Sequence, residues 1–236
     1  MEPGSAAEGE RPAVAMILAA GLGERMRPLT DSMPKPLLRV AGKPLIQYHV
    51  EALARAGITR LVVNLAWLGG SIRDHLGDGA RFGVRITYSE EHPAALESGG
   101  GIFRALRWLR PDPFLVVNGD VFCDVDFSVL RLAQPDDAHL VLVPNPPHHP
   151  AGDFGCEAGR ALSLGRGDAS FTFSGIGLYR KRFFDGCADG AFPLKPLLLR
   201  SMEAGRCSAQ LYQGLWEDVG TPVRLAALDE RLRSVR

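Results

Sequence analysis

The stretch LAAGLGERMRPLTDSMPKPLLRVAGKPLI, at 18–46, begins inside the apolar run VAMILAA at 14–20. The apolar run predicts a buried strand, and Gly21 and Gly23 allow a tight backbone turn directly after it. Backbone N–H groups in such a glycine turn can bind phosphate oxygens. Arg25 and Lys35 follow, and both cationic side chains are suited to phosphate. The stretch therefore predicts a phosphate-binding loop at the end of a buried strand.

Apolar and amphipathic segments alternate in the first half of the chain. Strands are expected at 14–20, 60–65, 84–90 and 114–120, and helices at 44–56, 71–77 and 99–109. This alternation predicts an α/β fold with a Rossmann-like mixed, mostly parallel sheet flanked by helices. Ligands of such sheets bind outside the carboxyl ends of the strands, which here are Gly21 and Asp120.

The second half of the chain is less regular. Strands are expected at 139–144, 171–179 and within 211–220, and helices at 192–205 and 221–234. Thr221 and Pro222 form an N-cap and a first helical residue for the last helix. The small, polar segment 1–13 is interpreted as a disordered tail and not as a secretory signal, and 14–236 as one domain.

Composition indicates a cytoplasmic protein. Hydrophobic residues make up 46% of the chain, and 27 Lys and Arg balance 27 Asp and Glu, so neither a nucleic-acid nor a membrane partner is expected. The chain has no apolar stretch of about 18 residues, so no transmembrane helix is expected. The four cysteines lack metal-ligand spacing and are expected to be reduced, isolated thiols.

The opening stretch resembles the nucleotide-binding loop of the sugar-1-phosphate nucleotidyltransferases, whose pattern is roughly LAAGxGxR, MxPxT, PKPLxxVxGKPLI. The resemblance implies the nucleotide-diphospho-sugar transferase fold, with a nucleotide-binding part at about 14–135, a sugar-binding part at about 136–220 and the final helix. The nucleotide would be bound by Ala20, Gly21, Gly23, Glu24 and Arg25. Arg25 and Lys35 would be catalytic, holding the β- and γ-phosphates and the α-phosphate respectively.

Two further segments are similar to family elements that supply magnesium ligands. VVNGDV at 116–121 resembles the element with a strand-end aspartate, here Asp120, and LWEDVGTP at 215–222 resembles the element with a second one, here Asp218. The resemblance thus implies Mg²⁺ as the cofactor. Magnesium commonly binds one or two carboxylates together with phosphates, which agrees with this pair.

LESGGGI at 96–102 resembles the base-recognition loop of the family, so Ser98 and Gly99 are expected to contact the nucleotide. This form of the loop looks like the branch that makes UDP-N-acetylmuramic acid during cell-wall recycling. The expected substrates are therefore UTP and N-acetylmuramate-1-phosphate. Mannose-1-phosphate guanylyl transfer and glucose-1-phosphate nucleotidyl transfer stay open as alternatives.

The sequence gives few signals for the residues that bind the sugar-1-phosphate. Many relatives hold the sugar phosphate with a Glu-Lys pair, but CEAGRALSLGRGDA at 156–169 offers none. The candidates by position are Asn118, Asp153, Gly155, Ser174 and Gly175. Lys195 is interpreted as a solvated lysine, and the adjacent pair His148 and His149 as unable to share one metal.

Two other classes of protein fit the sequence less well. A catalytically silent regulatory subunit would be expected to lose the phosphate and metal side chains, whereas Arg25, Lys35, Asp120 and Asp218 are all present. A nicotinamide dehydrogenase needs a third loop glycine and an acidic residue at the end of the second strand, where this chain has Asn64. The sequence does not predict the oligomeric state.

Overall fold

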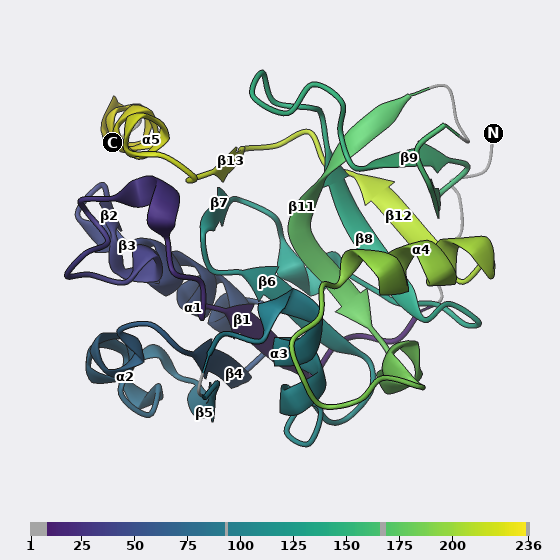
Figure 1. Cartoon of the computed structure of the whole chain (residues 1–236), viewed down its shortest axis with the longest axis horizontal. Coiled ribbons are helices and arrows are strands. Elements are labelled where there is room, and N and C mark those ends of the chain that lie inside the picture. The colour runs from purple at the N-terminus through teal and green to yellow at the C-terminus, as the bar shows by residue number, and fades with distance from the viewer. Residues whose placement is uncertain (1–8, 93, 166–168, 235–236) are drawn as a thin grey trace.

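The computed structural model describes residues 9–92, 94–165 and 169–234. Within them, one nine-stranded sheet runs through the molecule in the order β5-β4-β1-β6-β11-β8-β12-β10-β9 (Figure 1). Its strands are β1 Val14–Leu18, β4 Arg60–Leu65, β5 Arg85–Glu90, β6 Phe114–Asn118, β8 Ala138–Val143, β9 Phe154–Glu157, β10 Arg160–Leu162, β11 Ser170–Tyr179 and β12 Cys207–Leu211. The predicted α/β class with a mixed sheet is confirmed. The described sheet is not mostly parallel, because parallel pairing is confined to β5-β4-β1-β6 and to β8 with β12, and the other pairs are antiparallel.

The sheet reverses its order beside β1. β4 and β6 pair with β1 in parallel, one on each side, and β5 continues in parallel beyond β4. β11 pairs antiparallel with both β6 and β8. The point between β1 and β6 is therefore the topological switch point, where open α/β sheets bind ligands.

Helices cover both faces of the sheet. They are α1 Leu45–Arg55, α2 Gly69–Leu76, α3 Glu97–Ala105, α4 Lys195–Glu203 and α5 Pro222–Ser234. Side chains of β1 alternate between two cores, because successive residues of a strand face opposite ways. Ile17 packs with α1 and α2 on one face, whereas Met16 packs with α3 and α4 on the other.

A third, smaller core lies at the carboxyl edge of the sheet. Two short ribbons contribute to it, β2 Arg39–Val40 with β3 Lys43–Pro44, and β7 Val121–Cys123 with β13 Trp216–Asp218. Met26 from the first loop, Val219 after β13 and Leu228 of α5 are packed together there. Figure 1 shows α5 beside the β2–β3 ribbon, away from α4.

Several predicted boundaries shift. α4 begins at Lys195 and not at 192, because Pro196 fits only the first turn of a helix. The strand β12 was not predicted, and it lies parallel to β8. Residues 1–8 of the expected tail lie outside the described residues. Glu10 forms a β-bridge with Leu132, so the expectation of disorder up to residue 13 is wrong there.

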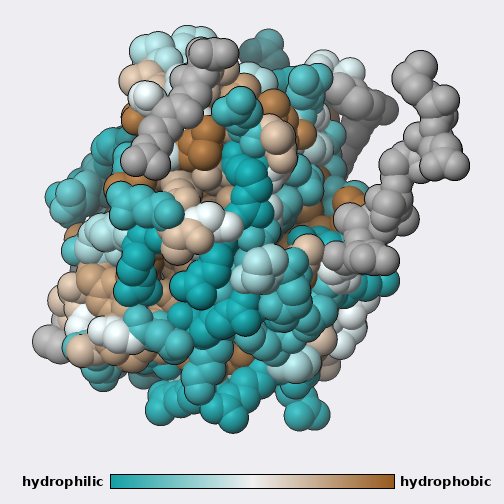
Figure 2. Space-filling view, turned by 90° about the vertical axis from the view of Figure 1, so that its right-hand side faces the viewer, coloured by the Kyte–Doolittle hydropathy of each residue, from teal (hydrophilic) through white to brown (hydrophobic). Residues whose placement is uncertain are grey.

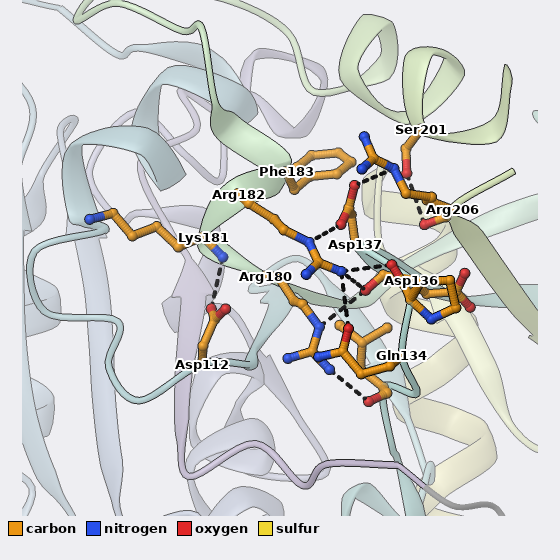
Figure 3. Close-up of polar contacts among 12 residues, drawn as sticks. Asp112, Gln134, Asp136, Asp137, Arg180, Lys181, Arg182, Phe183, Ser201 and Arg206 are labelled. Atoms are coloured by element: carbon orange, nitrogen blue, oxygen red, sulfur yellow. Dashed lines mark hydrogen bonds and ion pairs between the residues drawn. The ribbon is translucent and has the colours of Figure 1, made fainter. Parts of the chain in front are cut away.

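A network of arginines and aspartates joins the start of β8 to the end of β11 (Figure 3). Arg180 is almost fully buried and donates to the Asp136 carbonyl at 3.1 Å and to Glu10 at 2.9 Å. Asp137 is paired with both Arg182 and Arg206. Because each buried charge has a partner, the network fixes the ends of β8 and β11 without leaving an isolated ion.

The remaining general expectations concern thiols and membranes. The four cysteines are free. Within the described segments, no helix is both long and apolar enough to cross a bilayer. Figure 2 shows a face whose residues are mostly hydrophilic, with apolar residues scattered in small groups.

His49 makes the stability of the fold depend on pH. Its ring is buried in α1, Nε2 lies 2.8 Å from the Val121 carbonyl oxygen, and burial lowers its pKa to about 4. The unfolded chain binds a proton on this residue below about pH 6.5, whereas the folded protein does not until about pH 4. This contribution is therefore complete above pH 6.5 and lost as the pH falls towards 4.

We expect the free energy of unfolding to lose about 3 kcal/mol through His49 between pH 6.5 and pH 4. The His49→Gln variant should show a flatter profile over this interval in urea unfolding measured by circular dichroism. Equal slopes for the variant and the wild type would mean that folding does not lower the pKa of His49.

Candidate active site

A cavity of about 600 Å³ opens at the carboxyl ends of β1, β4 and β6. Segments from along the whole chain contribute to it, from the first loop to the residue before Thr221. Its lining comprises residues 18–26, Lys35, Pro36, Asn64, Glu91, Ala95, Glu97, Ser98, Asn118, Asp120 and Gly220. The cavity thus lies at the switch point of the sheet.

The glycine loop is anchored on one side and open on the other. Gly23 has a φ of 66°, which a residue with a side chain rarely adopts, and its carbonyl accepts a 2.8 Å hydrogen bond from Thr30. Met26 is buried in the third core. Arg25 lies between these anchors and lines the cavity. Its predicted position beside the nucleotide phosphates is therefore structurally accessible.

Lys35 and Asp120 both line the cavity and contact each other. Lys35 is only 7% exposed, and its Nζ donates to Asp120 Oδ2 at 2.6 Å. Asp120 follows Gly119, whose N–H donates to the Leu18 carbonyl at 2.8 Å. This backbone contact places Asp120 beside the start of the glycine loop. The lysine ammonium and the carboxylate neutralise each other at the point where phosphates are expected.

Asp218 reaches the same region through strand pairing. β13 pairs antiparallel with β7 so that Asp218 lies opposite Val121, and Val219 N–H donates to the Asp120 carbonyl at 3.1 Å. The indole N–H of Trp216 donates to the Ser174 carbonyl at 2.9 Å and ties β13 to β11. The two predicted metal ligands therefore sit on neighbouring backbone segments.

The donor set suits a hard divalent cation. Within residues 9–92, 94–165 and 169–234, no group of three or more His, Cys, Asp or Glu side chains converges on one point. Asp120 and Asp218 offer two carboxylates, which is what magnesium commonly takes from a protein when phosphates complete its coordination. The arrangement fits a cation that binds together with phosphorylated ligands.

The two residues predicted to recognise the base, Ser98 and Gly99, lie in different surroundings at the start of α3. Ser98 lines the cavity. Gly99 does not; it is buried against Phe192, while the Phe192 carbonyl accepts a hydrogen bond from Gly100. Glu97, which the sequence interpretation did not single out, lines the cavity with a φ of 58°. Such a conformation is uncommon for a residue with a side chain and concentrates at functional sites.

Asn64 and Glu91 form a buried network that the sequence interpretation also missed. Asn64 accepts a 2.7 Å hydrogen bond from the Ala19 N–H and donates to Glu91 at 2.7 Å. Glu91 in turn accepts from the Leu96 N–H at 2.7 Å. The network joins the glycine loop to the start of α3, so it fixes the two walls of the cavity relative to each other.

The predicted sugar-side residues are dispersed. Asn118 lines the cavity, and Gly175, with a φ of 78°, contacts its side chain. Ser174 is fully buried, and its hydroxyl donates to the Val141 carbonyl, so it is occupied within the fold. Asp153 and Gly155 do not line the cavity. Gly155 is paired within the sheet.

The two adjacent histidines contact different carboxylates. His148 Nε2 lies 3.4 Å from Asp218, and His149 Nε2 lies 3.4 Å from Asp153. Asp153 also accepts a hydrogen bond from the Phe173 N–H, and Lys195 approaches it at 3.8 Å with a side chain that is 55% exposed. The loop carrying the histidines therefore lies over the Asp218 side of the site.

Known proteins resemble this chain over most of its length. The model of the Nucleotidyl transferase family matches residues 14–161. An N-acetylmuramate alpha-1-phosphate uridylyltransferase of Neisseria meningitidis is 52% identical over 89% of this chain and 94% of its own. One of the same name from Caulobacter vibrioides is 35% identical over 94% of this chain and 98% of its own.

A solved structure supports the fold. It is described as a glucose-1-phosphate thymidylyltransferase of Bacillus anthracis and superposes with a TM-score of 0.81 at 22% identity, covering 94% of this chain and 96% of that one. At this identity the likeness concerns the architecture alone. The nucleotide-diphospho-sugar transferase fold is therefore confirmed.

Removing the Asn64 amide should destabilise the protein. Asn64→Ala leaves the Ala19 N–H and the Glu91 carboxylate without their buried partner, and we expect a loss of about 2–5 kcal/mol in the free energy of unfolding. Gln47→Ala is the matched control, because this half-buried amide also donates to a glutamate, Glu51, at 2.7 Å. It should lose less than about 1 kcal/mol. If both variants lost the same free energy of unfolding in urea, the Asn64 network would contribute no more stability than the Gln47–Glu51 contact.

Proposed function

The chain belongs to the nucleotidyl transferase family, and we propose that it transfers the uridylyl group of UTP to N-acetylmuramate-1-phosphate and releases pyrophosphate. One observation carries the proposal. A single cavity joins a glycine loop, Arg25 and the Lys35–Asp120 pair, with Asp218 on the neighbouring strand. These are the groups that a reaction between two phosphates requires.

The choice of sugar and base is supported by the relatives. The Neisseria and Caulobacter proteins are both named for N-acetylmuramate-1-phosphate and uridylyl transfer, and both are covered almost completely by this chain. The product would be a nucleotide-activated cell-wall sugar, which suits a cytoplasmic enzyme of peptidoglycan recycling.

The reaction needs positioning more than acid–base chemistry. An oxygen of the sugar phosphate attacks the α-phosphorus in line, a new P–O bond forms, and the bond to the bridging oxygen of the β-phosphate breaks. The nucleophile is already an anion, so no general base is required. The protein must hold two repelling phosphates together and neutralise the growing charge.

The residues divide this work. Arg25, on the loop, would hold the β- and γ-phosphates and the leaving pyrophosphate, and Lys35 would bind the α-phosphate. Asp120 and Asp218 would hold Mg²⁺. When bound, the ion supplies positive charge that neutralises the phosphates. Lys35 lies close to the proposed Mg²⁺ position, since its Nζ contacts Asp120.

The substrate assignment is tested by pyrophosphate release. The protein is incubated with Mg²⁺, each of UTP, dTTP, GTP, ATP and CTP, and a panel of sugar-1-phosphates that includes N-acetylmuramate-1-phosphate. The proposal expects release with UTP and the muramic sugar. Preferential release with GTP and mannose-1-phosphate, or with a glucose-1-phosphate, would overturn it.

The role of Lys35 predicts a kinetic defect. Lys35→Ala should lower kcat by roughly 10²–10³-fold, the range found when one preorganised electrostatic contact is removed. Lys43→Ala is the matched control, because Lys43 also pairs with a carboxylate, that of Glu51, but does not line the cavity. The control should retain turnover close to wild type. A Lys35→Ala protein with near-normal kcat would remove Lys35 from the mechanism.

A further inference from the structure

Arg224 stands beside the second carboxylate of the site. It lies in the first turn of α5, and its Nη1 is 3.1 Å from Asp218 Oδ2. A Cβ added to Gly220 would overlap Nη2 of Arg224, so the guanidinium lies directly over the backbone of a residue that lines the cavity. The side chain is only 18% exposed. A cation is therefore held beside Gly220, at the edge of the cavity.

The hydrogen-bonding capacity of this guanidinium is not used up. In the part of the chain that the structure describes, Nε and Nη1 are shielded from solvent and have no hydrogen-bond acceptor, although Nη1 is within ion-pair distance of Asp218. A guanidinium carries five N–H donors, and buried donors without acceptors are costly. Such a group is suited to a ligand that brings several acceptor oxygens.

Lys35 and Arg224 are both ion-paired with a predicted metal ligand. Each cation pairs with one of the two carboxylates, Lys35 with Asp120 and Arg224 with Asp218. A divalent cation bound to both carboxylates would free both side chains to turn towards phosphate. Lys35 and Arg25 are taken up by the nucleotide in the proposed reaction, which leaves the second phosphate without an assigned cation.

We propose that Arg224 binds the phosphate of the sugar-1-phosphate. Its planar fork matches the oxygens of a phosphate in two parallel hydrogen bonds, which a lysine cannot reproduce. It would take the place of the Glu-Lys pair that residues 156–169 do not provide. The proposal rests on the proposed function only in requiring a sugar-1-phosphate substrate, whichever sugar that is.

Two other basic side chains in this region, Lys195 and His148, are less suited to bind the sugar phosphate. Lys195 is more than half exposed and associates with Asp153, outside the cavity lining. His148 contacts the same Asp218 oxygen from a loop, at 3.4 Å, and offers at most one donor to a shared ligand. Arg224 alone among these three combines burial with unused donors.

The test uses Arg224→Gln with the sugar-1-phosphate that the wild type turns over in the pyrophosphate assay. We expect its KM for the sugar-1-phosphate to rise roughly 10- to 100-fold, the effect of losing charge-assisted hydrogen bonds, with the KM for the nucleotide within about twofold. Calorimetric binding of the sugar-1-phosphate, with Mg²⁺ and a non-hydrolysable nucleotide analogue present, should weaken equally. Arg224→Lys keeps the charge, so its KM for the sugar-1-phosphate should lie between those of the wild type and Arg224→Gln.

Arg231→Gln is the matched control. Arg231 lies on the same helix and pairs with Glu217, next to Asp218, at 3.3 Å, but it is 56% exposed. It should leave both KM values and the calorimetric affinity unchanged. Thermal unfolding of each variant separates loss of binding from loss of fold, and Arg224→Lys stands in if Arg224→Gln does not fold.

Two results would overturn the assignment. An unchanged affinity for the sugar-1-phosphate in the folded Arg224 variant would show that the guanidinium does not reach the substrate. Equal losses for nucleotide and sugar-1-phosphate would make Arg224 a support for Asp218 only. A wild type that turns over a different sugar-1-phosphate would refute the proposed substrate and leave the Arg224 test to be run with that sugar.

Discussion

The site depends on the close approach of two strand ends, where the Gly119 N–H donates to the Leu18 carbonyl at 2.8 Å. A side chain at Gly119 could not be accommodated, since its Cβ would sit 2.7 Å from that carbonyl oxygen. The contact joins β6 to β1 at the point where the strand order reverses. Because the glycine loop leaves one strand and Asp120 leaves the other, the phosphate-binding backbone and the first carboxylate begin at the same place.

The second carboxylate is added by a long-range pairing. β13 comes from far along the chain and aligns with β7, directly after Asp120. Packing then holds the parts together, since the third core contains Met26 from the loop next to Arg25 and Val219 next to Asp218. A change in that apolar cluster would therefore shift cation and carboxylate together, although neither belongs to it.

Much of this arrangement could be predicted from local pattern. The run before Gly21 and the run before Asp120 are apolar enough to be buried strands, and the α/β alternation places their ends at one edge. Ser98, at the start of α3, also lines the cavity, and its contact with a nucleotide stays a prediction. The assignment to a family rested on a long, dense stretch of residues, whose individual roles in binding stay predictions.

Other features have no local signal. Asn64 lies one residue before the end of an ordinary strand, and nothing in the neighbouring residues reveals that its amide joins Ala19 to Glu91. The pairing of β11 with β8 shifts register between Phe173 and Ile176, so simple alternation could not show that the Ser174 hydroxyl turns inward to Val141. Arg224 resembles any helix-surface arginine until the fold places it against Asp218.

Helix α5 buries little apolar surface, which affects how many folded molecules have all the side chains of the site in place. Leu228 is its one buried side chain, with Leu225 and Leu232 partly buried against the third core. Segments with few buried apolar contacts open locally at a lower free energy than the global unfolding of the sheet. Undocking of α5 would carry Arg224 away from Asp218 while the Lys35–Asp120 pair remained in place. On the proposed role of Arg224, the fraction of molecules able to bind the sugar phosphate would depend on the docking equilibrium of this one helix, even where the sheet is fully folded.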